Sequence, residues 1–242
     1  ARATPLPTTS SSTLSALPPP PARPISSATV PSKQPLAPGE GARDAITIAR
    51  DANSIEDLRE RLEAFAGCAL KFTATNTVFA DGNPSSDIMF IGEAPGVDED
   101  RQGLPFVGAS GQLLNRILSA LGQERSSVYI SNILFWRPPG NRSPTAAETA
   151  ACLPFVRRHI ELAQPKLLVF LGGSSSKVML GRTEGIMRLR GKWFEYTSDG
   201  LEAPIPAMPT FHPAFLLRQP AQKREAWRDF LTIQEKLEKL QI

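Results

Sequence analysis

The sequence predicts an α/β fold in three layers, with a central, mainly parallel four-stranded sheet between two layers of helices. Three apolar runs, at 87–91, 128–134 and 167–171, have the length and continuous apolar character of strands that are buried on both faces. A fourth strand is expected at 205–210. Strands that alternate with helical patterns in this way form parallel sheets covered on both sides.

Helical patterns lie between these strands. Ser54 and Asp57 have the spacing of a capping box, so a helix is expected to begin there. Gly122 is expected to end the second helix, because glycine tolerates the left-handed backbone found after a last helical turn. The helices are expected at about 54–66, 109–121, 145–163 and 221–240, with a short helix that follows the loop at 172–176 and ends at Leu180.

The composition divides the chain into a tail and a domain. Residues 1–39 contain ten of the 23 prolines and no acidic residue, which is typical of a segment that cannot bury enough apolar surface to fold. We therefore expect a disordered tail over residues 1–50 and one folded domain over residues 51–242. The tail accounts for the formal charge of +3, so binding of a polyanion by the neutral domain would depend on local clusters of arginine and lysine.

The sequence also limits the cellular context. No run of about 18 apolar residues is present, so we expect no membrane contact. The two cysteines, Cys68 and Cys152, lie far apart in apolar surroundings, which favours a reducing compartment over a disulfide framework. We expect a cytoplasmic protein and a monomer.

The segment after the first strand predicts a ligand site. Gly92-Glu93-Ala94-Pro95-Gly96 lies at the carboxyl end of that strand, where open α/β sheets bind ligands. Glu93 and Glu99 supply carboxylates, and Phe106 supplies a flat apolar face. These groups favour a planar ligand with polar edges, such as a nucleobase.

The other three strands also end in polar or glycine-rich loops, at Asn132, at 172–176 and at His212. Asn132 could instead satisfy backbone groups, and His212 could be a structural turn residue. His159 is expected on a solvated helix face and Trp227 in the core. The glycine loops have neither the G-x-G-x-x-G spacing nor a Walker ending, which disfavours a nucleotide cofactor.

Four blocks of this sequence resemble, in order and spacing, those of the uracil-DNA glycosylase superfamily, most closely its family 4 enzymes. They are GEAPGVDEDRQGLPFVG (92–108), ISNILFWRPPGNRSPT (130–145), PKLLVFLGG (165–173) and TFHPAFLLR (210–218). The resemblance covers about residues 54–240. It implies a monofunctional DNA repair glycosylase, associated with a bacterial nucleoid, that flips uracil out of single- or double-stranded DNA and leaves an abasic site.

The resemblance also implies residue roles. The catalytic residues would be Glu99, which would position or deprotonate water, His212, which would reach uracil O2, and Glu93. The uracil-binding residues would be Ala94 and Glu93 at the pocket floor, Phe106 stacked on the base, and Asn132 at its polar edge. DNA contacts would come from Arg137, Arg142, Gly172, Ser174, Leu216 and Arg218, with Phe215, Leu216 and Leu217 as an apolar wedge.

The chain departs from the family 4 pattern at the iron–sulfur cluster. The four positions that match the family's cluster cysteines read Phe65, Cys68, Trp136 and Cys152, and two thiolates cannot complete a cluster that needs four ligands. We therefore expect no cofactor and no metal, with Phe65 and Trp136 as apolar packing in that place. Residues 135–145 contain no histidine, so we also expect none of the covalent DNA trapping seen in related proteins.

Two other functions stay open at this level. The protein could bind uracil-containing DNA or abasic sites without turnover. Alternatively, it could be a small-molecule nucleotide-binding domain, whose affinity would not fall steeply with salt as DNA binding does.

Overall fold

A six-stranded sheet lies at the centre of the computed structural model, which describes Ala1 and residues 40–240. The strand order is β1-β3-β2-β4-β6-β5. Four neighbouring strands are parallel, β3 (Tyr129–Asn132), β2 (Ile88–Gly92), β4 (Leu167–Leu171) and β6 (Ile205–Thr210). Three of them lie at the predicted apolar runs and the fourth at the strand expected over 205–210, so the α/β fold class is confirmed.

Two short edge strands extend the predicted four-stranded sheet to six. β1 (Ala80–Gly82) pairs antiparallel with β3, and β5 (Phe194–Tyr196) pairs antiparallel with β6. Each has only three residues, too few for an alternating or apolar pattern to be recognised in the sequence.

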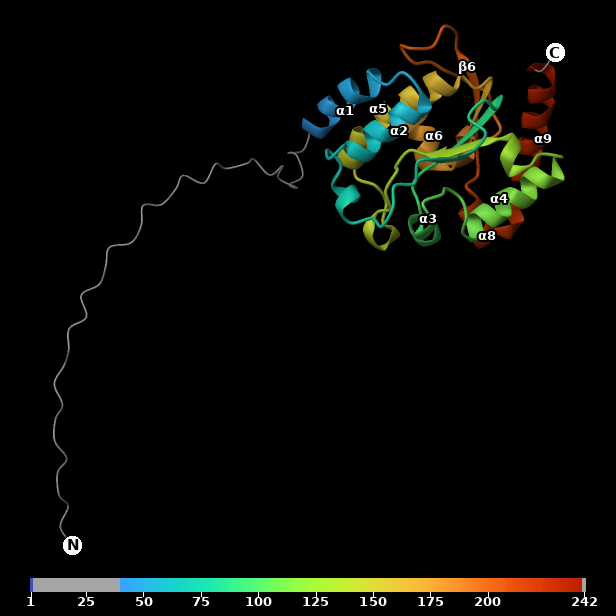
Figure 1. The fold of residues 1–242 in the computed structure, drawn as a ribbon. Coiled ribbons are helices and arrows are strands. Elements are labelled where there is room, and N and C mark those ends of the chain that lie inside the picture. The colour runs from blue at the N-terminus through green and yellow to red at the C-terminus, as the bar shows by residue number, and fades with distance from the viewer. Residues whose placement is uncertain (2–39, 241–242) are drawn as a thin grey trace. The chain divides into compact units, whose positions relative to one another are not determined.

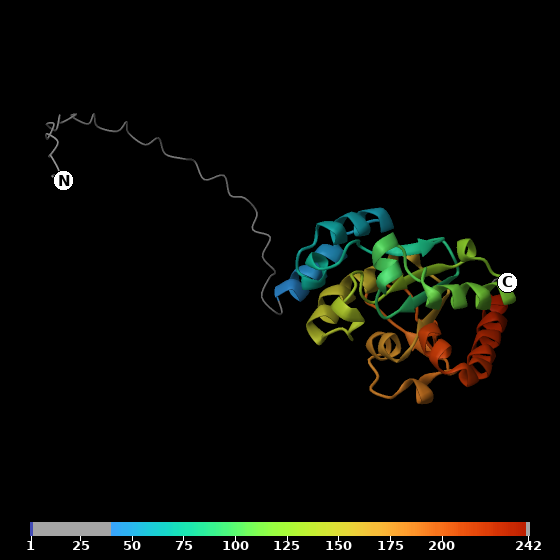
Figure 2. The ribbon, with the colours of Figure 1, turned by 90° about the horizontal axis from the view of Figure 1, so that it is seen from below.

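Helices cover both faces of the sheet. On one face α2 (Ile55–Ala64) and α5 (Ala146–Ala163) pack, with α6 (Gly173–Leu180), against inward side chains such as Met89 and Ile91. On the other face α4 (Ala109–Ala120) and α9 (Lys223–Leu240) pack against Ile88 and Phe90. Successive strand residues thus enter opposite cores, as the pleat requires. Figure 1 and Figure 2 show the two groups of helices on opposite sides of the sheet.

Helix α1 (Glu40–Arg50) corrects the predicted boundary of the disordered tail. Its residues Ala45 and Ala49 are buried in the same cluster as α5, and Arg158 of α5 donates two hydrogen bonds, of 3.1 and 2.8 Å, to the carbonyl of Ala52. The helix therefore belongs to the folded unit. The rest of the predicted tail, residues 2–39, lies outside the described residues.

Short helices fill the loops at the carboxyl edge of the parallel strands and between the longer elements. They are α3 (Val97–Gln102), α7 (Ile186–Leu189), α8 (Pro213–Arg218), and the 3₁₀ turns η1 (Ala69–Phe72), η2 (Arg125–Ser127), η3 (Pro139–Asn141) and η4 (Pro220–Gln222). No helix within the described residues is long and apolar enough to cross a membrane.

Two single-residue predictions were wrong. His159 is fully buried instead of solvated: its Nε2 lies 2.7 Å from the hydroxyl of Tyr129 and its ring stacks 4.4 Å from Phe79. Burial lowers the pKa of His159 to about 3, so the ring is neutral. Trp227 is 37% exposed on α9 and is not a core residue.

Candidate active site

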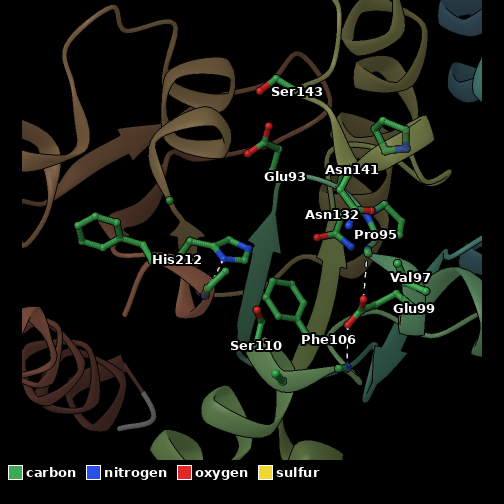
Figure 3. A pocket seen from close by; sticks show the side chains of 18 of the residues that line it. Glu93, Pro95, Val97, Glu99, Phe106, Ser110, Asn132, Asn141, Ser143 and His212 are labelled. Carbon is green, nitrogen blue, oxygen red and sulfur yellow. Dashed lines mark hydrogen bonds between the residues drawn. The ribbon is translucent and has the colours of Figure 1, made fainter. Parts of the chain in front are cut away.

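A cavity of about 660 Å³ opens where the four parallel strands end. It is lined by Glu93 after β2, Asn132 at the end of β3, Gly172 after β4 and His212 after β6, so the predicted convergence of the four loops on one edge is confirmed. Figure 3 shows the side chains of Glu93, Asn132 and His212 around one space. This edge is where open α/β sheets bind their ligands.

Asn132 presents an unsatisfied polar group to this cavity. It is 1% exposed, and its Oδ1 has no hydrogen-bond partner among the described residues. Gly92, its register partner on β2, makes room for it: a Cβ at Gly92 would lie 2.6 Å from the ring of Phe106 and closer still to Asn132 Oδ1. Burying a polar atom without a hydrogen-bond partner costs free energy of folding. Asn132 therefore indicates a binding site whose ligand donates a hydrogen bond to Oδ1.

Phe106 forms an apolar wall of the cavity and is buried, with 4% of its surface exposed. Its ring lies 5.5 Å from that of His212, at an angle of 31°. Its backbone has φ of 53°, in the left-handed region that a bulky residue rarely adopts. The ring and the histidine thus border the space from neighbouring sides, as Figure 3 shows.

His212 caps helix α8 and is held in one tautomer. Its Nδ1 accepts a 3.1 Å hydrogen bond from the backbone N–H of Ala214. Burial, with a smaller effect of the charge on Arg218, lowers the pKa of His212 to about 4, against an opposing effect of Glu99. The neutral ring therefore carries its proton on Nε2, where it can donate a hydrogen bond.

The carboxylate of Glu99 is a hub of backbone hydrogen bonds at the cavity wall. Oε1 accepts from the N–H groups of Val107 at 2.9 Å and Gly108 at 2.8 Å, and Oε2 accepts from Gly96 at 3.1 Å. A carboxylate has about four lone-pair positions. Glu99 therefore closes the loop over residues 96–108 and keeps one acceptor position on Oε2.

Glu93 and Ala94 line the cavity beside Asn132, and both are half-buried. The backbone carbonyl of Glu93 accepts a 3.0 Å hydrogen bond from Leu134, which ties it to the segment after β3. The Glu93 side chain also borders a second cavity of about 220 Å³, together with Ser174 and Lys177. Ser174 thus lies at the smaller cavity and not at the main one.

The three arginines that were predicted to contact DNA differ in their position at the cavity and in their partners. Arg218 is exposed at the cavity mouth and makes no ion pair with a described residue. Arg142 also lines the cavity but pairs with Glu148 through two hydrogen bonds, of 2.9 and 2.5 Å. Arg137 lies outside the lining and donates to Asn141 Oδ1 at 2.7 Å. Of the three, Arg218 is the cation that a ligand reaches without displacing a partner.

The predicted wedge residue Leu216 is corrected by its burial. It is 1% exposed and packs with Phe211 and Ala226, because residues 213–218 form helix α8 and turn this side chain inward. Leu217, on the outer side of the helix, is 43% exposed.

The turn at Gly172 approaches His212 closely. Gly172 has φ of 97°, and a Cβ there would lie 3.0 Å from Cβ of His212, so glycine is required for this close approach.

The sequence interpretation did not assign several cavity residues to the site, among them Ser110, Asn141 and Ile186. Ser110 is the second residue of α4, Asn141 ends the turn η3 with φ of 55°, and Ile186 begins α7. Asn141 lies within a block already singled out and could have been found from it. Ser110 and Ile186 carry no chemistry-bearing pattern, and only the fold brings them to the cavity.

The two cysteines lie together in the core near α5, with Cys68 1% and Cys152 0% exposed. A hydrogen bond between the thiols lowers the pKa of Cys68 and raises that of Cys152. Phe65 and Trp136 are buried in the same cluster. Phe65 packs 5.1 Å from Phe155, and the indole N–H of Trp136 donates to Thr77 Oγ1 at 3.0 Å.

These residues do not fit a four-ligand cluster. Within the described residues, no group of three or more His, Cys, Asp or Glu side chains is placed to hold a metal ion. Two of the four positions in question carry aromatic rings, which offer no ligand for iron and fill the space themselves.

The sheet and its cavity define an α/β protein with a ligand-sized cavity at the carboxyl edge of four parallel strands. A profile of the uracil DNA glycosylase superfamily matches residues 79–231. The Type-4 uracil-DNA glycosylase of Sulfurisphaera tokodaii is 39% identical over 76% of this chain and 84% of its own length. The Type-4 uracil-DNA glycosylase of Archaeoglobus fulgidus is 37% identical over 75% of this chain and 92% of its own length. That of Thermotoga maritima is 38% identical over 68% of this chain and 83% of its own length. The chain belongs to the uracil DNA glycosylase superfamily.

Proposed function

We propose that this protein is a monofunctional uracil-DNA glycosylase that starts DNA repair by hydrolysing the N-glycosidic bond of uracil. The observation that carries the proposal is the unpartnered, buried Oδ1 of Asn132 beside the apolar wall of Phe106. An amide can accept from uracil N3–H and donate to O4 at once, whereas cytosine has no N3–H and places an amine at the second position. Buried groups left unpaired by the wrong base provide strong discrimination.

His212 stabilises the departing base in this proposal. Breaking the glycosidic bond leaves negative charge on uracil, and a donor aimed at O2 lowers the energy of that state most when it is already oriented. The hydrogen bond from Ala214 to Nδ1 supports this role, because it directs the remaining proton to Nε2. A neutral donor also keeps the site free of a fixed positive charge before the bond breaks.

Glu99 positions the attacking water and stabilises positive charge on the sugar. Its free acceptor position on Oε2 supports a water-positioning role more than a role as a mobile base, since three backbone N–H groups fix the carboxylate. The sugar in such reactions has oxocarbenium character, which a nearby carboxylate favours. Glu93 and Ala94 complete the floor of the base pocket.

DNA is bound across the cavity mouth, with uracil flipped into the cavity. Flipping costs a few kcal/mol of unstacking, and an inserted apolar side chain offsets part of that loss. We assign the wedge to Leu217 in place of the buried Leu216, with Arg218 beside it on a phosphate. The loop at Gly172, which precedes α6, the amide of Ser174 in the first turn of α6, and the side chains of Arg137 and Arg142 are further contacts to the DNA backbone.

The protein acts without an iron–sulfur cluster. The buried aromatic side chains of Phe65 and Trp136 support this, because they occupy the positions where family 4 enzymes carry cluster cysteines. Iron content and the visible absorption of protein purified without oxygen test the proposal. Less than about one-tenth of an iron atom per chain is expected, and a stoichiometric four-iron signal would refute it.

We further propose that the enzyme is a cytoplasmic monomer that acts at the nucleoid, on single- or double-stranded DNA. The folded domain includes residues 40–240. Sedimentation at micromolar concentration tests the monomer, and a dimer would contradict it.

The function is tested with a labelled oligonucleotide that carries one uracil. The wild-type protein is expected to release uracil and leave an alkali-sensitive abasic site, and Asn132→Ala should lower kcat/KM by at least about 100-fold. An Arg59→Ala variant serves as the control, because Arg59 is exposed on α2 and, among the described residues, pairs only with Glu63. Tight binding of uracil-containing DNA without release would favour the binding protein instead.

A further inference from the structure

Phe106 adopts a backbone conformation that its own side chain does not favour. Its φ of 53° is one of three positive values at non-glycine residues in the described part of the chain. Such positions persist only when the surrounding structure holds them, and they gather at functional sites. The ring that walls the base pocket therefore depends on contacts made by its backbone.

Arg125, from the turn η2, holds the backbone of this strained residue. Its Nη1 donates to the carbonyl of Phe106 at 3.0 Å, and its Nη2 donates to the carbonyl of Pro105. The two N–H groups bind successive carbonyls, one before and one after the Phe106 Cα. A guanidinium carries five N–H donors on three nitrogens in one plane, whereas an ammonium group has three donors on a single nitrogen and cannot reproduce this arrangement.

The guanidinium is itself fixed by two further side chains. Its Nε pairs with the carboxylate of Asp81 on β1, and Nη1 also donates to Asn115 Oδ1 on α4 at 3.2 Å. The Arg125 side chain is 23% exposed and that of Asp81 28%. Arg125 thus links three elements: the edge strand β1, its own turn η2 and helix α4. Its guanidinium lies next to the Phe106 backbone.

Gly111 closes the other side of the same peptide. A Cβ at Gly111 would lie 2.8 Å from Cα of Phe106 and would overlap its carbonyl group. Helix α4 therefore packs directly onto the Phe106 carbonyl, the same group that accepts from Arg125. The peptide has no room to relax on this side.

We propose that Arg125 is a positioning residue for base recognition, which sets the angle and depth of the Phe106 ring by clamping the carbonyls of Pro105 and Phe106. This inference rests on the proposed function, because it assigns a second layer to the same base pocket. Arg125 lies outside the cavity lining and touches no reacting atom. It acts through Phe106.

Arg158 provides a matched control. Its side chain is 24% exposed, it donates to the carbonyl of Ala52 through Nε and Nη2, and it pairs with Glu161 at 3.1 Å. It is thus a carbonyl-binding arginine of similar burial, with an acidic partner, at the junction of α1 and α5 and away from the cavity. A general loss of packing should affect both arginines alike.

The kinetic test is a double-mutant cycle on a single-stranded uracil oligonucleotide. Arg125→Met should lower kcat/KM about tenfold or more, while Arg158→Met stays within about twofold of wild type. In a Phe106→Ala background, Arg125→Met should cost less than about twofold further, because there is no ring left to position. Arg125→Lys keeps the positive charge opposite Asp81 and should not restore activity. If Arg125→Met fails to fold, Arg125→Lys takes its place as the test variant. Additive losses, or full activity of Arg125→Lys, would overturn the proposal.

A second readout does not depend on activity. With 4-fluorophenylalanine incorporated, the ¹⁹F resonance that Phe106→Leu removes reports the surroundings of that ring. Arg125→Lys should shift or broaden this resonance, and Arg158→Met should leave it in place; an unmoved resonance would refute the clamp. If wild-type protein releases no uracil but the resonance follows Arg125, the proposed function fails and the clamp stands.

Discussion

Gly92→Ala provides a direct test of how tightly the base pocket is built. A Cβ on Gly92 would lie 2.6 Å from the Phe106 ring, and closer to Asn132 Oδ1, whereas ordinary contact begins at 3.4 Å. The ring would have to retreat by about 0.8 Å, at a cost of about 1–3 kcal/mol for an overpacked core. Because a shift of about 1 Å in a positioning group can cost about 100-fold in rate, we expect a similar loss of kcat/KM.

The assay is uracil release from a single-stranded oligonucleotide under single-turnover conditions, with urea unfolding in parallel. Gly185→Ala is the matched control, since no atom lies within 4 Å of its added Cβ and its φ is −72°. Gly185→Ala should keep wild-type activity. If Gly92→Ala is folded and as active as wild type, the Asn132 and Phe106 side chains are not held as tightly as the geometry indicates, and the reasoning fails.

Three further predictions concern protonation and DNA. His159 has a pKa of about 3 in the folded protein and an ordinary pKa of 6.5 in the unfolded chain. Its contribution to the free energy of unfolding is therefore complete above pH 6.5 and is lost as the pH falls toward 3, at about 1.4 kcal/mol per pH unit. The double variant His159→Leu with Tyr129→Phe should flatten this slope in urea titrations; an unchanged slope would assign it to other groups. Because the pKa of His212 is lowered to about 4, kcat/KM should show no loss from its protonation between about pH 8 and pH 5; a fall with a midpoint near 6.5 that His212→Asn abolishes would contradict this. Leu217→Ala should lower excision from duplex DNA about tenfold or more and leave single-stranded DNA unaffected, since only a duplex has a stack to refill; equal losses on both substrates would count against the wedge.

The four parallel strands and the edge of the sheet that carries the site could be predicted from the sequence. Continuous apolar runs ended by glycine or polar residues specify both the strands and the position of their loops. This reasoning needs only local patterns, which is why it located Glu93, Asn132 and His212 together.

What the sequence did not show depends on contacts between distant segments. Arg125 has no local pattern, because its partners are backbone carbonyls about 20 residues earlier and a carboxylate on β1. His159 stands among charged residues on α5, and only the position of Tyr129 on β3 makes a buried histidine acceptable. Leu216 and Leu217 look equivalent in sequence, and the helix at α8 separates them.

The adjacent acids of α3 have a consequence for how mutants of this site are interpreted. Glu99 binds the amides of Val107 and Gly108, while Asp100 accepts from the backbone amides of Thr75 at 2.8 Å and Asn76 at 3.2 Å. The short helix therefore joins two segments that are otherwise far apart in the sequence. A Glu99→Ala variant would release one of these segments as well as remove a carboxylate, so its loss of rate would measure a freed loop together with a missing water ligand. Kinetics at this position separate the two effects only when paired with hydrogen exchange at the amides of Val107 and Gly108.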